Sequence, residues 1–484
     1  MIATLAAAMM SLAAGASSAD RLAIGSIALT PCELSRPRSA ATNAAWCASF
    51  EVPENRAEPN GRKLSLRLAV IKAEGAAEPD PIVLLAGGPG QAATESWASV
   101  VQALTPLARH RHVILLDQRG TGGSNPLRCP ADDSLDADFN IARARDLAKR
   151  CAESLKDKAD LRYYTTSDAV DDLEALRVAL GDVKYNLVGI SYGTRVAQQY
   201  LTRHPGGVRS AVLDGVAPNE LAFGAEFARN LDEALKGRFA QCAKDKACNE
   251  RYGDIYKTLY ETRAKLQREP VQVAIRDPLD YAAKERRLDG NVMDSLVRLF
   301  AYSTETAALL PLAISEAAAG NNAPLVGQAE FVTQELAAGM TAGMGLSVIC
   351  SEDVDLAQER PEDASLILGK TLVEAMRAQC EVWPKGRRPD DFHAPVKSDL
   401  PVLLLSGEFD PVTPPRYGDA VLKGLAHGRH LVALGQGHNV IGRGCLPRVV
   451  KRFVEELETD KLEAGCIADF GAAPFFLGYN GAAP

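Results

Sequence analysis

Residues 185–193 read YNLVGISYG, and residues 194–203, which follow, read TRVAQQYLTR. The run 185–190 is apolar and has the length of a buried strand, whereas the later stretch has the composition of a helix. Ser191 therefore stands at a sharp turn between a strand and a helix, with a glycine two positions away on each side. Gly-x-Ser-x-Gly in this setting is typical of a nucleophile elbow; the alternative is a plain Gly/Ser turn. The N–H of Tyr192 would open the helix and face a negative charge that develops beside the serine.

Short apolar runs recur along the chain, and each ends at a turn signal. They are 64–71, 81–86, 112–117, 209–214, 401–406 and 430–434. Runs of this kind, apolar on both faces, are typical of buried strands in a parallel sheet. Amphipathic helices such as 168–180 lie between several of them, which predicts an α/β fold with right-handed crossovers. Near the start, the runs 48–52 and 64–71 flank turn-like residues and predict an antiparallel hairpin at one sheet edge.

A long segment, residues 218–395, interrupts this alternation. It has no comparable strand run and is rich in Ala, Leu, Glu, Lys and Arg at helical spacing, for example in 223–242 and 290–310. Its length of about 180 residues is too great for a loop, so we expect a mostly helical domain inserted into the α/β core. The chain of 484 residues is thereby divided into a first core part (20–217), the insertion (218–395), and a second core part with a C-terminal tail (396–484).

Composition and charge exclude several classes of protein. The chain is 46% hydrophobic and 24% charged, as is usual for a folded globular protein, and its formal net charge is −8. Because it contains no run of Lys and Arg, we expect no nucleic-acid partner and no stable membrane association. Residues 1–19 carry no charged side chain and end in small residues, which predicts a signal peptide and export to the periplasm or the extracellular space. The alternative is an uncleaved or lipid-anchored hydrophobic N-terminus.

The chain has ten cysteines, and they fall into neighbouring pairs along the sequence. They are Cys32, Cys47, Cys129, Cys151, Cys242, Cys248, Cys350, Cys380, Cys445 and Cys466. An even number of cysteines in an exported protein favours disulfides, and sequential pairing is the simplest of the possible schemes. A metal site is not indicated, because the sequence has neither Cys-x-x-Cys nor His-Glu-x-x-His and only seven histidines.

A serine nucleophile needs a histidine base that a carboxylate orients, in the chain order serine, acid, histidine for this kind of elbow. His438 lies in 435–439, just past the last apolar run, at the strand edge where active sites of open α/β sheets gather. His430 and His427 lie at the opposite end of that strand, and His204 follows the helix of the elbow. We therefore predict His438 as the base.

The acid is predicted by the same reasoning. Asp410 directly follows the run 401–406, one strand before the histidine, and stands 28 positions before His438. Its position favours a catalytic role over a simple turn residue before a proline. Asp214, which ends the preceding strand, and Glu408 are the alternatives.

A second donor to a developing oxyanion should come from the loop after an early strand. Residues 86–90 read AGGPG and follow the run 81–86, and glycines there let backbone N–H groups approach a substrate. Pro89 has no N–H, so Gly88 is the predicted donor. The alternative is a Gly/Pro turn with a structural role only. Phosphate binding is not indicated, because the signature of a P-loop is missing.

Taken together, these motifs resemble the prolyl-aminopeptidase-like serine peptidases of the α/β-hydrolase fold, and most of all the secreted bacterial tripeptidyl-aminopeptidase type. The matching residues are Gly87-Gly88-Pro89-Gly90, Asp117-Gln118-Arg119-Gly120-Thr121-Gly122-Gly123-Ser124, Gly189–Gly193 with Thr194-Arg195, Leu213-Asp214-Gly215, Ser406–Pro414 and Gly437-His438. The resemblance covers about 84–438, and residues 445–476 resemble the end of the tripeptidyl type. It implies a mostly parallel twisted sheet flanked by helices, with a large helical cap domain inserted.

The resemblance also implies peptide substrates that are cleaved near a free N-terminus, without a metal or an organic cofactor. Members of the family that trim N-termini hold the α-amino group with acids of the cap. Here the candidates are Glu352 and Asp353, because a carboxylate attracts an ammonium and rejects blocked termini; the alternative is a solvated acidic turn. Asp117 and Arg119 are predicted to support the loop under the oxyanion site rather than to perform chemistry.

Two other functions stay open at this point. An esterase or lipase uses the same serine, acid and histidine, so these residues do not separate esters from amides. A binding protein that keeps the fold without catalysis is the third possibility, and the intact Ser191, Asp410 and His438 argue against it.

Overall fold

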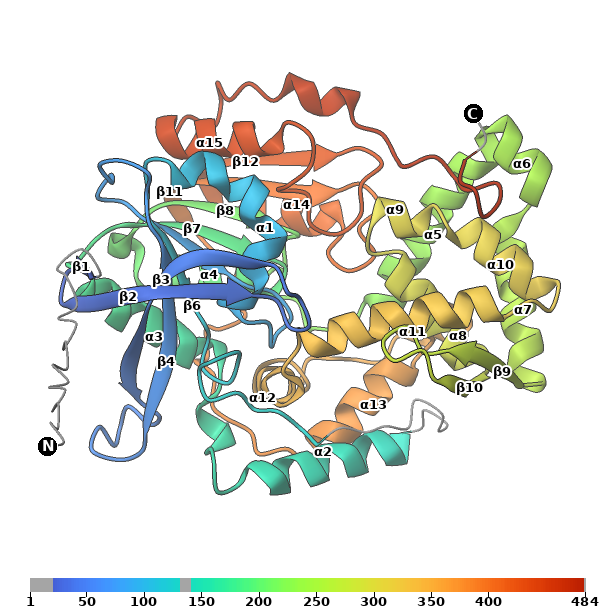
Figure 1. Ribbon diagram of the computed structural model, residues 1–484, viewed down its shortest axis with the longest axis horizontal. Helices are drawn as coiled ribbons and strands as arrows, with labels where there is room; N and C mark the ends of the chain where they lie inside the picture. The colour runs from blue at the N-terminus through green and yellow to red at the C-terminus, as the bar shows by residue number, and fades with distance from the viewer. Residues whose placement is uncertain (1–20, 131–140, 483–484) are drawn as a thin grey trace, which may run out of the picture.

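A computed structural model of the protein describes residues 21–130 and 141–482, so the predicted signal peptide lies outside the described residues. A ten-stranded sheet forms one part of the molecule, and a mostly helical part sits beside it (Figure 1). No helix in the described ranges is both long and apolar enough to cross a membrane.

The large sheet has the strand order β1-β2-β3-β4-β6-β5-β7-β8-β11-β12. Its strands are β1 (Leu22–Ile24), β2 (Ile27–Ser35), β3 (Thr42–Pro53), β4 (Lys63–Ile71), β5 (Ile82–Leu85), β6 (Val113–Leu116), β7 (Tyr185–Ile190), β8 (Val208–Asp214), β11 (Ser398–Gly407) and β12 (Leu425–Ala433). From β6 to β12 the neighbouring strands run parallel, and from β1 to β6 they pair antiparallel. The predicted mostly parallel sheet is confirmed.

Helices cover both faces of this sheet. They are α1 (Ala93–Ala108), α3 (Thr166–Ala179), α4 (Tyr192–Arg203), α14 (Pro415–Leu422) and α15 (Leu446–Glu456). A further helix of this part of the chain, α2 (Ile141–Leu155), packs against residues 371–380 rather than along the sheet (Figure 1). Successive side chains of a strand enter opposite cores: in β11, Val402 and Leu404 pack with α3 and α4, whereas Leu403 and Leu405 pack with α1 and α15. This double burial explains why the sequence runs are apolar throughout rather than alternating.

Between β8 and β11 the chain leaves the sheet and builds the second part of the molecule (Figure 1). Its elements are α5 (Phe227–Lys244), α6 (Lys246–Tyr252), α7 (Ile255–Arg268), β9 (Val271–Arg276), β10 (Ala283–Leu288), α8 (Gly290–Phe300), α9 (Thr304–Ala307), α10 (Leu310–Ala318), α11 (Ala323–Ala338), α12 (Ala342–Glu352) and α13 (Thr371–Cys380). Apolar residues of α5, α7, α8, α10 and α11 form a hydrophobic core of their own. We call this part the cap.

Two local expectations differ from the structure. The hairpin predicted at a sheet edge, β3 and β4, is antiparallel but lies inside the sheet, because β1 and β2 extend the sheet beyond it. The cap also contains a small antiparallel pair, β9 and β10. In β9 only Val273 and Ile275 are buried while their neighbours are exposed, so the strand is apolar on one face and short, and its signal is weak within a helical segment.

The ten cysteines form five disulfides between sequence neighbours, as the simplest scheme predicted. Their separations along the chain range from 6 residues for Cys242–Cys248 to 30 residues for Cys350–Cys380. Five disulfides fit an exported protein, because oxidising compartments favour their formation.

We predict that no thiol reacts when the unreduced protein is denatured and alkylated, because every cysteine is paired. Peptide mapping should recover the five sequential pairs. Reduction should lower the free energy of unfolding by about 2–5 kcal/mol for each bond lost, measured by denaturant titration. An alkylated cysteine in the unreduced protein would contradict the pairing.

Candidate active site

Ser191 sits at the turn between β7 and α4 with its backbone at φ 55° and ψ −120°. This left-handed conformation is unfavourable for a residue with a side chain, and it persists only where the surroundings enforce it. Both flanking glycines are packed too tightly for any other residue. A Cβ on Gly189 would stand 2.5 Å from the carbonyl oxygen of Gly193, and a Cβ on Gly193 would stand 2.1 Å from that of Leu85. The sequence motif therefore forms the elbow that it predicts.

The loop after β5 lies directly over this serine. A Cβ on Gly87 would stand only 3.2 Å from the Cβ of Ser191, so the loop approaches as closely as it does because glycine occupies that position. Within the described residues, the backbone N–H groups of Gly88 and Tyr192 donate to no other group. Two donors without an acceptor next to a serine are suited to binding an oxyanion.

His438 and Asp410 are brought together as the sequence predicts. The Nδ1 atom of His438 lies 2.7 Å from Oδ2 of Asp410, and Asp410 is 1% exposed. The other carboxylate oxygen accepts the N–H groups of Val412 and Thr413, each at 2.8 Å, and the Thr413 hydroxyl donates to Oδ2 at 2.9 Å. These bonds fix the orientation of the carboxylate and therefore that of the imidazole.

His438 and Asp410 each shift the pKa of the other. Burial lowers the pKa of His438, but the charge of Asp410 and their hydrogen bond raise it by more, so the pKa lies above its ordinary value of 6.5. For Asp410, burial raises the pKa, yet His438 and the backbone N–H groups outweigh burial and leave the pKa below its ordinary value. At neutral pH the pair therefore holds an ionised carboxylate next to a histidine that binds a proton readily.

Ser191 and His438 both contact the chain at the end of β8. The Ser191 N–H donates to the carbonyl of Asp214 at 2.8 Å, and a Cβ on the next residue, Gly215, would stand 3.0 Å from Cε1 of His438. No hydrogen bond joins the Ser191 hydroxyl to His438 within the described part of the chain. Nucleophile–base hydrogen bonds often form fully only when substrate is bound, so this geometry is compatible with a serine–histidine pair.

The two alternative acids have other partners. The carboxylate of Asp214 is completely buried and accepts the N–H groups of Val440 and Ile441, all at 2.9 Å. Burial raises the pKa of Asp214 to about 6. Glu408 accepts the N–H of Gly435 at 2.7 Å. Asp214 thus binds the elbow through its carbonyl and the histidine loop through its carboxylate, which makes it a positioning residue that the sequence did not identify as such.

The cap covers the site from two directions. Tyr302, just after α8, accepts the His438 N–H on its carbonyl at 2.7 Å, and its ring stands edge-on to the imidazole with the centroids 5.5 Å apart. On the other side, Thr341 donates its N–H to the carbonyl of Gly90 at 2.9 Å. Nothing in the sequence distinguishes Tyr302 or Thr341 from neighbouring cap residues, so both were missed.

The two predicted substrate-binding acids lie deep inside the protein. Glu352 and Asp353 are both 0% exposed. Glu352 accepts the N–H of Thr166 at 2.6 Å and its hydroxyl at 2.8 Å, and burial raises the pKa of Glu352 to about 8. Asp353 forms an ion pair with Arg195 of α4, with Nη1 at 2.8 and 3.0 Å from its oxygens. In this structure they therefore join α12 to α3 and α4.

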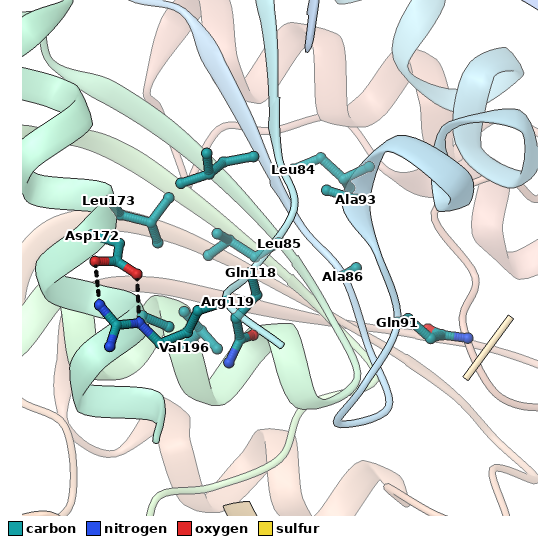
Figure 2. Close-up of a pocket in the computed structure, with 12 residues that line it drawn as sticks. Leu84, Leu85, Ala86, Gln91, Ala93, Gln118, Arg119, Asp172, Leu173 and Val196 are labelled. Atoms are coloured by element: carbon teal, nitrogen blue, oxygen red, sulfur yellow. Dashed lines mark hydrogen bonds and ion pairs between the residues drawn. The ribbon is translucent and has the colours of Figure 1, made fainter. Parts of the chain in front are cut away.

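Asp117 and Arg119 also have internal partners. Asp117 accepts the N–H and hydroxyl of Thr94 and the N–H of Gly123, at 2.8 to 3.0 Å. Arg119, which is 0% exposed, forms two hydrogen bonds of 2.7 Å to Asp172 (Figure 2). This pair lines a small cavity of about 20 Å³ behind the end of β5. The internal hydrogen bonds of Asp117 and of Arg119 agree with the predicted role of supporting the loop that carries Gly88.

A parallel sheet with a serine at such an elbow, near a histidine that a buried aspartate orients, is the architecture of the α/β-fold serine hydrolases. A model of the alpha/beta hydrolase fold family matches residues 80–443, and the chain belongs to this family. No cluster of three or more potential metal ligands occurs in the described ranges.

Comparison with known proteins places serine peptidases among its relatives. The serine protease Hip1 of Mycobacterium tuberculosis (strain ATCC 25618 / H37Rv) is 25% identical over 466 residues, covering 88% of each chain. The tripeptidyl aminopeptidase of Streptomyces lividans is 26% identical over 402 residues, covering 76% of this chain and 73% of that one. A crystal structure of proline iminopeptidase from Mycobacterium smegmatis covers 84% of this chain and 98% of its own, with a TM-score of 0.43 and 17% identity. The expected class, a serine hydrolase related to the peptidases of this fold, is confirmed.

As the predicted base, His438 would have to be neutral to accept a proton, and its pKa is raised; we therefore predict that kcat/KM falls toward acid with an apparent pKa above 6.5. Asp410→Asn removes the charge that raises this pKa, so the acid limb should move to lower pH. Turnover should also drop by about 10⁴-fold, because the imidazole loses its orienting partner. A pH–rate profile of both proteins measures this, and an unchanged acid limb in the variant would contradict the assignment.

A second prediction concerns Asp214. Asp214→Ala leaves two buried N–H groups without an acceptor, which should lower the free energy of unfolding by about 1–3 kcal/mol for each group and reduce kcat/KM by loosening the histidine loop. Asp214→Asn keeps one acceptor oxygen and should fall between the wild type and the alanine variant. Denaturant titration and kinetics test this order, and full activity of Asp214→Ala would refute it.

Proposed function

We propose that the protein is an exported serine peptidase that cleaves peptides near a free N-terminus, as an aminopeptidase of the prolyl or tripeptidyl type. In this proposal Ser191, Asp410 and His438 form the catalytic triad, and the N–H groups of Gly88 and Tyr192 form the oxyanion hole. The observation that carries it is the 2.7 Å contact between Nδ1 of His438 and Oδ2 of Asp410. The imidazole of His438 abuts Gly215, which directly follows Asp214, the residue whose carbonyl accepts the N–H of the elbow serine.

The mechanism is covalent hydrolysis. His438 Nε2 takes the proton from Ser191 Oγ as the oxygen attacks the scissile carbonyl, and the two N–H groups hold the negative oxygen of the tetrahedral intermediate. His438 then gives the proton to the leaving amine. Water attacks the acyl-enzyme in the same way and restores the serine. Asp410 keeps the Nδ1 tautomer and stabilises the imidazolium, and the steps need no metal or organic cofactor.

The choice of peptides over esters is supported by the relatives. The serine protease and the tripeptidyl aminopeptidase named above align over most of this chain, including the cap region. A carboxylesterase of the same fold is the alternative, because the chemistry of the triad serves both bonds. The preference for a substrate with a free N-terminus rests on the aminopeptidase relative. Glu352 and Asp353 give it no separate support, because both have internal partners here.

The domain division and the compartment are also parts of the proposal. Residues 20–217 and 396–484 would form the hydrolase core, and 218–395 the cap over the site. The hydrogen bonds of Tyr302 to His438 and of Thr341 to Gly90 support this division. Residues 1–19 would direct export to the periplasm or the extracellular space. The five disulfides support an oxidising compartment.

Ser191→Ala is predicted to abolish turnover and labelling by a fluorophosphonate probe while the fold is preserved, because the hydroxyl is the attacking group. Thermal unfolding and circular dichroism provide the control for folding. A binding protein without catalysis would not label even as wild type, and activity retained by the variant would refute the triad.

The same prediction extends to substrates. A panel of aminoacyl, dipeptidyl and tripeptidyl reporter amides, with free and blocked N-termini, should be tested beside short acyl esters. We expect amides with a free N-terminus to be cleaved with the highest kcat/KM. Turnover of esters alone would exclude the peptidase, and a preference for blocked peptides would exclude the aminopeptidase.

A further inference from the structure

A cavity of about 440 Å³ lies where α2 meets the cap helices α8 and α11. Figure 1 shows α2 and α13 along one side of this region and α8 and α11 on the other. Much of its lining is apolar, contributed by Leu147, Val292, Leu296, Leu299, Val326 and Leu372. This size and lining are those of a site for a small organic ligand or a few residues of a peptide.

Arg298 brings a positive charge into this lining. Within the described residues, no carboxylate forms an ion pair with it, and its Nε–H has no acceptor. One terminal nitrogen donates to the Tyr302 hydroxyl at 2.9 Å. By contrast, the carboxylate in the same lining, Glu330, is held by two hydrogen bonds from Arg286, at 3.1 and 3.0 Å. The charge of Arg298 therefore stays available to a ligand.

Aromatic contacts hold the guanidinium of Arg298 in place. Its central carbon lies 4.5 Å from the ring centroid of Phe227 and 5.5 Å from that of Tyr302. Stacking of this kind fixes the planar group before a ligand arrives, which lowers the entropy cost of binding. Arg298 is thus a preorganised cation rather than a mobile surface side chain.

The same residues connect the cavity to the catalytic histidine. Tyr302, whose hydroxyl accepts from Arg298, also contacts the ring of His438 and accepts its backbone N–H. One cap tyrosine therefore separates Arg298 from the imidazole. Arg298, which lines the cavity, and the imidazole of His438 therefore contact the same cap tyrosine.

We propose that this cavity is a substrate subsite and that Arg298 recognises an acidic side chain of the peptide, which makes Arg298 a specificity-determining residue. The inference rests on the proposed peptidase function and adds the class of peptide preferred. An aspartate or glutamate carboxylate would accept from Nη1 of Arg298, which has no acceptor among the described residues, while its methylene groups contact the apolar lining. A lysine in the same subsite would be repelled.

The test uses tripeptidyl reporter amides in which each position in turn is Glu, Gln or Lys. At one position the wild-type enzyme should favour Glu over Gln by about tenfold or more in kcat/KM, as expected for a hydrogen bond between charged groups. Arg298→Gln should bring this ratio close to one, and Arg298→Lys, which keeps the charge, should retain part of it. Arg229→Gln is the matched control, because this substitution removes the same charge from the cap. Arg229 pairs with Glu233 and does not line the cavity.

A second series separates this inference from the proposed function. Aryl esters of succinate and butyrate compare a carboxylate with a neutral chain on a substrate that is not a peptide. Turnover of esters only, with a carboxylate preference lost in Arg298→Gln, would refute the peptidase while supporting the role of Arg298. Equal rates for Glu and Gln at every position, or a preference that survives in Arg298→Gln, would overturn the role of Arg298 even if peptides are cleaved. No turnover in either series would overturn both.

Discussion

The left-handed backbone of Ser191 is the constraint on which the rest of the site depends. Such a conformation costs on the order of 1–3 kcal/mol for a residue with a side chain, and tight packing enforces it here. Gly189 and Gly193 leave no space for a Cβ, and the Ser191 N–H is tied to the carbonyl of Asp214. The N–H of Tyr192 has no acceptor among the described residues, so the strained turn at Ser191 also leaves beside it an N–H suited to the proposed oxyanion hole.

Asp214 transmits this geometry to the histidine. Its carbonyl holds the elbow and its carboxylate holds the loop after His438, so one residue at the end of β8 sets the distance between nucleophile and base. Burying that carboxylate is unfavourable, as its raised pKa shows, and three hydrogen bonds of 2.9 Å compensate part of the cost. The arrangement ties the histidine loop to the end of β8, and it is costly to disrupt because the N–H groups of Val440 and Ile441 would lose their acceptor.

The sequence predicted those features that depend on local pattern and chain order. The turn at Ser191 and the contact between Asp410 and His438 were predicted because a strand, a turn and a chemically suitable residue are adjacent in sequence, and the fold places strand ends together. What it missed depends on distant packing. An Asp-Gly at a strand end does not reveal that its carboxylate will meet the N–H groups of residues more than 200 positions later. The sequence also left open that Glu352 and Asp353 form a solvated acidic turn, and their complete burial follows from how α12 packs on α3 and α4, which no local pattern records.

These same buried acids explain how the cap keeps its place over the site. A buried ion pair adds little net stability, because desolvation offsets most of its attraction, but it strongly disfavours any arrangement that leaves one partner unpaired. Arg195 lies on the helix that begins at the nucleophile, and Asp353 lies just after α12 of the cap. A displacement of α12 relative to α4 would separate two fully buried charges. The ion pair therefore holds α12 of the cap in one alignment with the helix that begins after Ser191, and in the proposed function this alignment also fixes the cap residue Tyr302 against His438.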